Sequence, residues 1–420
     1  MLRRHRLLAG IVLAGLLVRV AYVLATRDWA LRGDEIEYAA EGRFFAAGHP
    51  WWSALPYGIP HPSLWKAPAY PAWVGAWFSV LGPSLTPMRL AQALASCVTI
   101  VLTWALGRRL WGERVGLAGA AIVAVHPFAW DYDIGLFSEV FATPLTLLVL
   151  LLVLERPAGP RRAAVVGALV GASLLIRPTA GLLLAPVLVA LVLRLGLRRG
   201  VALTALAGVS AALVLVPWAY RNHHVAGGFV PVSIQDSALY GTFNDDAAHD
   251  RTYPWAWRPV TRRDLDLFRR AQPLGDVALR SRLLQRARSY IADHPASLAD
   301  AFFWNGLSRL WDVRRPARVL EDAQINGRSR PLTAIALALH WILLPLALLG
   351  LWRARRRPAL VWPLVALALA AAVVFSTAAA TRYRVPFEPV IALLAASGVF
   401  TGWRRSADPP APGARRAARG

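Results

Sequence analysis

The feature that most constrains the fold is a series of apolar stretches, most of them about as long as a bilayer is thick, separated by arginine-rich segments. A helix needs roughly 20 predominantly apolar residues to cross the hydrocarbon core of a bilayer. Ten such crossings can be placed in the 420 residues, of which 56% are hydrophobic. The sequence therefore predicts an all-α, polytopic integral membrane protein and excludes an ordinary soluble domain.

The first predicted span follows a basic start but is long enough to cross a bilayer, so we interpret it as a retained anchor rather than a signal peptide. Residues 163–197 are too long for one span and are divided into two by a turn near Arg177 and Pro178. The predicted spans are residues 7–25, 88–106, 115–130, 136–154, two within 163–197, then 201–219, 331–351, 360–380 and 385–403.

Arginines in the short loops set the predicted orientation. They lie before the first span and after every second crossing, at residues 3–6, 108–109, 156–162, 198–199 and 353–357. Because cytoplasmic loops carry an excess of basic residues, both termini are predicted to be cytoplasmic. Segments 26–66 and 220–330 then face the outer side of the plasma membrane. This topology accounts for much of the net charge of +23, and no nucleic acid is expected as a partner.

Four parts are predicted along the chain. They are a membrane module with the first seven spans (1–219), an outer-face helical segment (220–330), three further spans (331–403) and a disordered cytoplasmic tail (404–420). Residues 265–291 show helical spacing of apolar residues, and residues 68–81 predict a short helix at the outer interface of the membrane. No internal repeat indicates an inverted-repeat transporter.

Carboxylates gather at the predicted outer face. Asp34 and Glu35 follow the first span, and Asp131, Asp133 and Glu139 follow the third. Carboxylates are costly near lipid, so they usually face a polar cavity or take part in chemistry, for example as a general base. The first pair could instead begin a helix, with Asp34 as its N-cap, and the second pair could form a polar turn. Glu139 lies in an apolar stretch and should face a cavity.

Basic residues near the same face are candidates for binding an anion. Lys66 is the one lysine among 47 basic residues, which suggests a compact charge such as a phosphate needs, although an interfacial lysine is the alternative. Arg177, Arg221, Arg382 and Arg384 all lie at predicted outer ends of spans. Each could contact lipid headgroups, or together with Lys66 they could clamp a phosphate.

Metal and cofactor motifs are weak in this sequence. Cys97 is the single cysteine, so no disulfide or cysteine-based metal site is expected. His126, His223 and His224 have no spacing that specifies a metal site, and none is predicted from them. No cofactor is predicted, and a divalent cation that bridges carboxylates and a phosphate is left open.

Six short motifs follow one another at the predicted outer face. They are Gly33-Asp34-Glu35-x-x-Tyr38, Lys66-x-Pro68-x-Tyr70, Leu136-Phe137-Ser138-Glu139, Ile176-Arg177-Pro178-Thr179, Pro217-Trp218-x-x-Arg221-Asn222 and Arg382-Tyr383-Arg384-x-Pro386. In this order they resemble the GT-C superfamily of polyprenyl-phosphate-sugar glycosyltransferases. The branch they resemble is that of protein O-mannosyltransferases and lipid A aminoarabinose transferases, with a polytopic fold and interfacial helices in the first outer loop.

The resemblance implies an inverting transfer of a sugar from polyprenyl phosphate to an envelope acceptor on the outer face of the membrane. It implies Asp34 as the base with Glu35 beside it, and Glu139 as a second acid of the site. The expected phosphate-binding and cavity-lining residues are Lys66, Arg382, Arg384, Arg221 and Arg177, and Tyr38, Asp131, Asp133 and Tyr383, respectively. The expected partners are the lipid-linked sugar, membrane lipid and an envelope acceptor. A transporter or flippase of a lipid-linked anion is the main alternative, and a non-catalytic envelope protein is the second.

Overall fold

The computed structural model describes residues 2–28, 30–54, 58–154, 159–258 and 275–400. These residues form helices joined by short turns, with one two-stranded antiparallel ladder between β1 (Trp52–Ser53) and β2 (His61–Pro62). The longer helices are α1 (Leu2–Ala25), α2 (Asp34–Ala46), α3 (Ala69–Leu81), α4 (Leu85–Trp111), α5 (Glu113–Val125), α6 (Glu139–Leu154), α7 (Pro160–Ile176), α8 (Leu184–Leu195), α9 (Leu197–Ala226), α13 (Asp276–Asp293), α15 (Pro316–Ile325), α16 (Arg330–Arg353), α17 (Pro358–Val374) and α18 (Glu388–Phe400).

Shorter helices connect these elements. They are η1 (Pro127–Ala129), η2 (Pro178–Leu183), η3 (Gln235–Ala238), α10 (Leu239–Thr242), α11 (Asp245–Ala248), α14 (Ser297–Ala301), η5 (Phe302–Arg309), η6 (Phe375–Thr377) and η7 (Thr381–Phe387). The short helix predicted at 68–81 is confirmed as α3, and α13 confirms the later part of the helix predicted at 265–291. Residues 265–274 and the predicted tail lie outside the described residues.

A helix occupies each of the ten predicted spans, but not all of these helices are long enough to cross a bilayer. In the described ranges, seven helical segments are both long and apolar enough: His5–Ala25, Leu85–Trp111, Pro178–Leu195, Leu197–Ala226, Arg330–Arg353, Pro358–Thr377 and Thr381–Phe400. The helices α5, α6 and α7 have only 13, 16 and 17 residues. The multi-pass all-α fold is thus confirmed, whereas the count of ten spans is not.

The span predicted at 115–130 ends early for a local reason. Pro127 lacks a backbone N–H and cannot continue α5, which therefore stops at Val125. The chain then makes the short 3₁₀ turn η1 and a further turn before α6 begins at Glu139. Residues 126–138 thus form a buried connection at one end of the bundle rather than the ends of two helices.

Glycines allow several helices to approach closely. A Cβ atom added at Gly167 would lie 2.1 Å from the carbonyl oxygen of Ala207, where α7 packs along α9. A Cβ atom added at Gly350 would lie 2.0 Å from the carbonyl oxygen of Leu394, where α16 packs on α18. Close backbone contact of this kind compensates for the weak hydrophobic drive between helices surrounded by lipid. It fixes the position of α18, which follows directly on η7.

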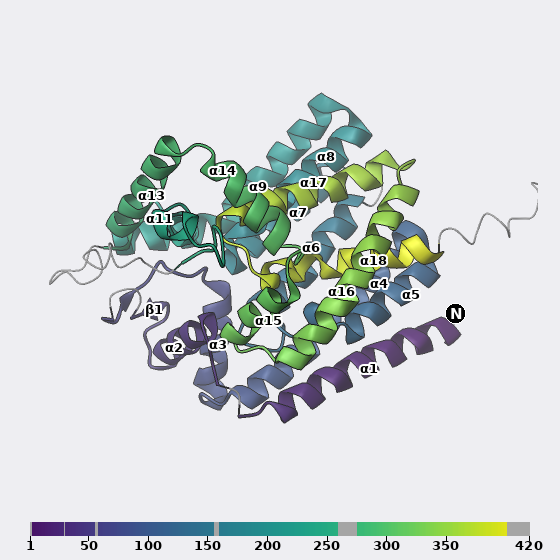
Figure 1. Cartoon of the computed structure of the whole chain (residues 1–420), viewed down its shortest axis with the longest axis horizontal. Coiled ribbons are helices and arrows are strands. Elements are labelled where there is room, and N and C mark those ends of the chain that lie inside the picture. The colour runs from purple at the N-terminus through teal and green to yellow at the C-terminus, as the bar shows by residue number, and fades with distance from the viewer. Residues whose placement is uncertain (1, 29, 55–57, 155–158, 259–274, 401–420) are drawn as a thin grey trace, which may run out of the picture.

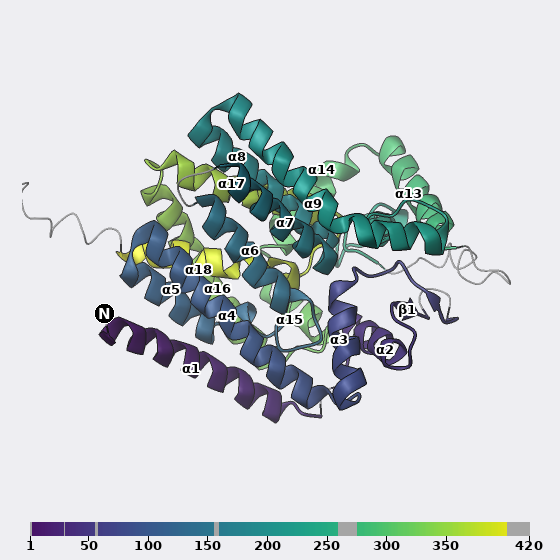
Figure 2. The same ribbon diagram turned by 180° about the vertical axis from the view of Figure 1, so that it is seen from behind.

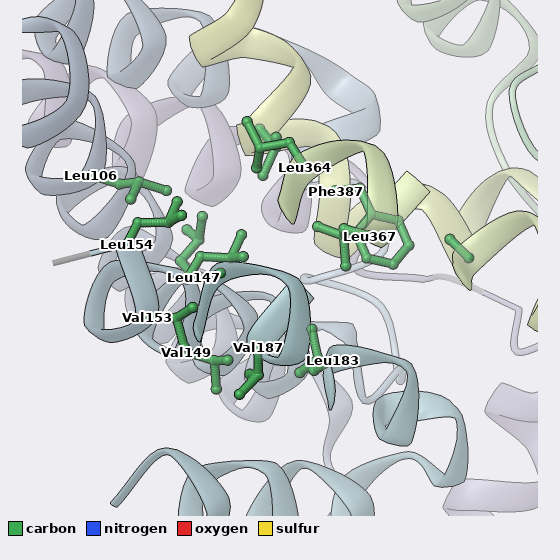
Figure 3. Close-up of a cluster of buried hydrophobic side chains, with 14 of the residues drawn as sticks. Leu106, Leu147, Val149, Val153, Leu154, Leu183, Val187, Leu364, Leu367 and Phe387 are labelled. Atoms are coloured by element: carbon green, nitrogen blue, oxygen red, sulfur yellow. The ribbon is translucent and has the colours of Figure 1, made fainter. Parts of the chain in front are cut away.

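The largest apolar core joins α4, α6, α8, α17 and the end of η7. Leu106, Leu147, Leu183, Leu367 and Phe387 are among its buried residues, and Figure 3 shows their side chains meeting between these helices. This core packs the second half of α6 against the end of η7. Two of the sequence motifs lie on these two elements.

The ends of the bundle differ. The first turn of α1 and the last turn of α18 lie at one end, while α2, α3, β1 and α13 lie at the other, as both views show (Figures 1 and 2). Described parts of the two predicted outer segments, 26–66 and 220–330, thus contact each other at this end of the molecule, for example where the backbone N–H of Leu64 donates to Asp276. The helix α2, which carries Asp34 and Glu35, lies at this end.

Candidate active site

The first turn of α2 separates the acidic residues of the first motif. Gly33 is the N-cap, with φ of +53°, so Asp34 is the first residue of the helix and not its cap. Glu35 and Glu37 follow in the same turn, where the positive end of the helix dipole stabilises carboxylates. Residues three and four apart share a helix face, so Asp34 lies with Glu37 and Tyr38, and Glu35 points elsewhere.

A cavity of about 220 Å³ lies against this face of α2. Its walls come from α2, the segment before α3, the turn from α7 to η2, the η3 segment and the η6–η7 region. The residues that line it include Asp34, Glu37, Tyr38, Trp65, Lys66, Ser138, Arg177, Thr179, Gln235, Trp257, Phe375, Arg382 and Tyr383. Segments that are far apart in the sequence therefore form one polar pocket.

Lys66 and Arg382 hold the carboxylate of Asp34 from its two sides. The Nζ atom of Lys66 lies 2.9 Å from Oδ1 of Asp34 and 2.6 Å from Oε2 of Glu37. Arg382 donates to the other oxygen of Asp34. The ring of Tyr38 lies beside Lys66, with its centroid 5.0 Å from Nζ, and adds a cation–π contact.

Glu139 joins the same group through two arginines. It begins α6 and is buried, and Arg177 donates a hydrogen bond to its Oε1 atom. The Nε atom of Arg382 lies 3.8 Å from the same oxygen. Arg177 and Arg382 also lie over the ring of Tyr383, at 5.2 and 5.0 Å. The apolar stretch around Glu139 thus turns its one carboxylate toward cations that line the cavity.

A balanced set of charges, which we call the cavity charges, lies at the cavity. Asp34, Glu37, Lys66, Arg177 and Arg382 line it, and the buried Glu139 pairs with the two arginines. Burial favours the protonated form of Asp34, but Arg382 and Lys66 outweigh it and hold the pKa of this carboxyl below its usual range. Burial likewise lowers the pKa of Lys66, but Asp34 and Glu37 outweigh it and raise that pKa well above its usual value. The three cations among them, Lys66, Arg177 and Arg382, can exchange a carboxylate partner for an anion that enters the cavity.

Glu35 faces away from the cavity and is paired with Arg328. The Nη2 atom of Arg328 lies 2.7 Å from Oε1 of Glu35, and its Nη1 atom lies 3.5 Å from Oδ1 of Asp131. The backbone N–H of Leu136 also donates to Glu35, at 3.3 Å. Glu35 and Asp131 therefore belong to a buried ion-pair network that ties α2 to the connection before α6.

Asp133 also lies outside the cavity lining. It accepts a hydrogen bond from Ser96 at 2.7 Å, and Arg19 donates to the same hydroxyl at 3.0 Å. Burial raises the pKa of Asp133 to about 7, although the hydrogen bond from Ser96 opposes this shift. The network thus connects α1, α4 and the 126–138 connection. We call the following group the buried charges: Asp133, Glu35, Asp131, Arg328 and Arg19, together with the hydroxyl group of Ser96 that joins Asp133 to Arg19.

Two of the arginines that were expected to bind a phosphate instead contact other residues of the protein. Arg384 is fully buried, with Nε 2.6 Å from Oε1 of Glu388 and Nη1 3.0 Å from Oδ2 of Asp312. Arg221 lies over the ring of Trp218 and donates to the carbonyl of Ser63 at 3.0 Å. Neither residue lines the cavity, whereas Lys66, Arg177 and Arg382 do.

The structure adds residues that the sequence analysis did not single out. Glu37 has a detectable signal, since it lies three residues after Asp34 on a helix and must share its face. Trp65 directly precedes Lys66 and lines the cavity beside it. Gln235 and Trp257 come from the long outer segment, and no motif marks them.

A divalent cation that binds Asp34 in this cavity would have to displace Lys66 or Arg382 from its carboxylate.

A family of known enzymes matches part of the sequence. Residues 65–220 match the family described as dolichyl-phosphate-mannose-protein mannosyltransferase. The matched range includes Lys66, Glu139 and Arg177, and it stops before Arg382.

Curated relatives match at moderate identity. The undecaprenyl phosphate-alpha-4-amino-4-deoxy-L-arabinose arabinosyl transferase of Pseudomonas aeruginosa is 28% identical over 238 residues, which cover 54% of this chain and 42% of that protein. This chain therefore spans less than half the length of the curated relatives it matches.

One solved structure shares the arrangement of helices, and a second superposes less closely. The oligosaccharyltransferase AglB from Archaeoglobus fulgidus, in complex with an inhibitory peptide and a dolichol-phosphate, superposes with a TM-score of 0.57 at 14% identity, over 96% of this chain and 50% of that one. ArnT from Cupriavidus metallidurans bound to undecaprenyl phosphate gives 0.46 at 18% identity, over 93% and 77% of the two chains. The family resemblance that the motifs indicate is thus confirmed.

Proposed function

We propose that this chain, which has the fold and the motifs of the GT-C superfamily, is an inverting glycosyltransferase. It transfers a sugar from a polyprenyl-phosphate donor to an envelope acceptor at the outer face of the plasma membrane. A lipid-linked donor suits this location, because nucleotide sugars are not available outside the cell. The names of its relatives support the donor, since one includes undecaprenyl phosphate and one structure holds a dolichol-phosphate.

The observation that carries this proposal is the convergence of Asp34, Lys66 and Arg382 in one cavity. Glycosyl transfer from a phosphate requires a base for the acceptor and cations for the leaving phosphate. The cavity holds both. A transporter would need the cations but has no use for a carboxylate held at the same point.

The cavity charges suggest how donor binding prepares the base. The donor phosphate competes with Asp34 for Lys66 and Arg382, and Arg177 lies on the same wall. Once these cations turn to the phosphate, the pKa of Asp34 rises from its depressed value and the carboxylate becomes a better proton acceptor. Donor binding and base activation are therefore linked through the same two side chains.

The chemical step is a single displacement. The acceptor oxygen forms a bond to the anomeric carbon while the bond from that carbon to the phosphate oxygen breaks. Asp34 takes the acceptor proton, and the lipid phosphate leaves with the bonding electron pair, stabilised by Lys66 and Arg382. No covalent intermediate between sugar and enzyme is required, and the anomeric configuration is inverted.

The orientation in the membrane follows from the arginine-rich loops. They favour cytoplasmic termini, and so they put the end with α2, α3 and α13 on the outer side. In this proposal the part of the chain before residue 220 supplies Asp34, Lys66, Glu139 and Arg177, and the three C-terminal spans supply Arg382.

The test uses proteoliposomes that contain the full chain and a panel of radiolabelled polyprenyl-phosphate sugars. Label transferred to an envelope acceptor fraction is compared for the wild type, Asp34→Asn and the exposed control Asp28→Asn. Transfer that is lost in Asp34→Asn and kept in Asp28→Asn supports the proposal. No transfer from any donor, together with equal lipid translocation by all three proteins, would instead establish a flippase.

A further inference from the structure

Three buried side chains from distant parts of the chain meet outside the cavity. His126 ends α5, His340 lies within α16 and Glu388 begins α18. Their potential ligand atoms all lie within 4.8 Å of one another. The Nε2 atom of His126 is 3.8 Å from Oε2 of Glu388, and Nδ1 of His340 is 3.9 Å from Oε1. We call this group the histidine cluster.

Four of the six polar side-chain atoms of the histidine cluster lack hydrogen bonds. In the described part of the chain, both ring nitrogens of His126, Nδ1 of His340 and Oε2 of Glu388 are buried without a hydrogen-bond partner. A buried polar group that is left unsatisfied destabilises the folded state, so such groups are rare. The separations of 3.8 and 3.9 Å are too long for direct hydrogen bonds between the three residues. Several unsatisfied groups that converge on one point indicate a missing ligand.

The tautomer of His340 also suits a ligand at this point. Its Nε2 atom lies 3.0 Å from the carbonyl oxygen of Trp311, which can only accept, so Nε2 carries the proton. The lone pair of Nδ1 then faces Glu388. A histidine that binds a metal through one nitrogen usually donates from the other to a carbonyl or carboxylate. Trp311 thus serves as the partner that orients such a ligand.

The charge around Glu388 leaves room for a cation. Arg384 contacts Oε1 of Glu388 at 2.6 Å, and it also contacts Asp312 at 3.0 Å. Asp312 also lies 3.6 Å from Nη2 of Arg314, so Arg384 is shared, and it pairs with only one oxygen of Glu388. The second oxygen of Glu388, Oε2, points to His126 rather than to Arg384.

We propose that His126, His340 and Glu388 bind one divalent transition-metal ion of the zinc class. Two imidazole nitrogens and one carboxylate oxygen are a donor set that zinc takes in proteins, with a fourth position for water. Bonds of about 2.0–2.2 Å require tetrahedral ligand atoms roughly 3.3–3.5 Å apart. The three ligand atoms lie within 4.8 Å of one another, so each pair would have to approach by at most about 1.5 Å on binding.

The ion would stabilise the wall of the cavity from behind. Glu388 follows directly on η7, the segment that carries Arg382 into the cavity and Arg384 to Glu388. Fixing Glu388 between α5 and α16 therefore fixes the position of η7. None of the three ligands lines the cavity, so the ion has a positioning role rather than contact with the substrate.

The test measures the metal content of the full chain, purified without a histidine tag, after dialysis against Zn²⁺ and removal of unbound ion. We expect about one zinc per chain in the wild type and in His224→Gln, a control that removes an exposed imidazole. His126→Gln and Glu388→Gln should lose that ion. With Co²⁺ in place of Zn²⁺, the wild type should show the visible absorption of a tetrahedral site, and both variants should lack it.

Two results would overturn the proposal. One is a wild type that retains no zinc or cobalt, and the other is equal retention by the wild type and a folded His126→Gln. His126→Gln is the decisive variant, because Glu388→Gln also removes a partner of Arg384 and could unfold the protein. Metal content is independent of sugar transfer, so this test and that of the proposed function can fail separately.

Discussion

Asp34 and Glu35 are neighbours in the first turn of one helix, yet they belong to different parts of the molecule. The side chain of Asp34 is 26% exposed and lies among the cavity charges. That of Glu35 is 0% exposed and lies among the buried charges, paired with Arg328. Successive residues of a helix point about 100° apart, which is enough to send two identical charges to a solvent-accessible cavity and to a closed interior.

The difference teaches what each ion pair can do. In the proposed function, a cation in the cavity leaves its carboxylate for a phosphate, since both groups line the same open space. Arg328 has no such option, because breaking a buried pair leaves an uncompensated charge in a medium of low dielectric constant. The cavity charges are suited to chemistry, and the buried charges hold the helices that carry them.

The largest effect should come from Asp34→Asn. Loss of a general base typically costs about 10²–10⁴-fold in rate. We expect a fall of that size in kcat for sugar transfer, with the thermal midpoint unchanged, because Lys66 keeps Glu37 as a partner at 2.6 Å. Single-turnover transfer and thermal unfolding in detergent measure the two quantities. Equal loss of activity in Asp28→Asn would contradict the assignment.

Glu35→Gln should show the opposite pattern, a loss of stability without a loss of donor affinity. It leaves Arg328 buried with a weakened network, and removal of one partner of a buried pair costs about 3–5 kcal/mol. The free energy of unfolding should fall by that order, while KM for the donor in the folded fraction stays the same. The double variant Glu35→Gln/Arg328→Met should recover part of the loss. A donor KM that rises in Glu35→Gln would show that the two regions are not separate.

Lys66→Met should weaken donor binding. A hydrogen bond to a charged group is worth about 1.5–3 kcal/mol, so the affinity for the lipid-linked sugar should fall roughly 10- to 100-fold. Equilibrium binding of a labelled donor measures this loss. Arg43→Gln, in the last turn of α2 and exposed, is the matched control that removes one positive charge outside the cavity. Equal weakening by both variants would point to a general charge effect.

The smallest effect concerns Glu41, which is buried on the same face of α2 as Asp34. Burial raises its pKa to about 8, with Glu37 and Asp34 adding to the shift and Lys66 opposing it. The folded state then holds a proton that the unfolded state releases above about pH 4.5. Stability should therefore decrease with rising pH up to about 8, by at most about 1.4 kcal/mol per unit.

Glu41→Gln removes this titration and should flatten the slope. Unfolding curves in detergent between pH 5 and pH 8 compare the variant with the wild type (about 1.4 kcal/mol per unit is the upper bound). An unchanged slope in the variant would assign the pH dependence to other groups. Asp133 is the alternative source, since burial raises its pKa to about 7.

Much of the candidate site could be predicted from motifs. Asp34, Lys66 and Arg382 were expected from a resemblance, and the structure brings these three into contact. Their roles in transfer stay predictions until they are measured. Asp131 and Arg384 were expected there too, but the structure places them in networks outside the cavity lining. Sequence position alone could not separate the residues that line the cavity from those that do not, because both groups were predicted at the outer ends of spans.

Other contacts had no local signal. His340 lies in an apolar helix and meets His126 only because α16 packs on α18 and on η1. Gln235 and Trp257 reach the cavity from a long segment in which neither charge nor spacing marks them. The span predicted at 115–130 ends early for a simpler reason, since Pro127 stops α5 at Val125.

The sequence by itself determined that this chain forms apolar helices, that its arginines lie in short loops between them, and that its motifs resemble one superfamily. These properties depend on neighbouring residues, through hydropathy and helix periodicity. Only the tertiary structure decided which charge meets which. Asp34 and Arg382 are 348 residues apart, and their contact exists because packing of the helices closes that distance. Helix phase then decides that Asp34 enters the cavity while Glu35 is buried.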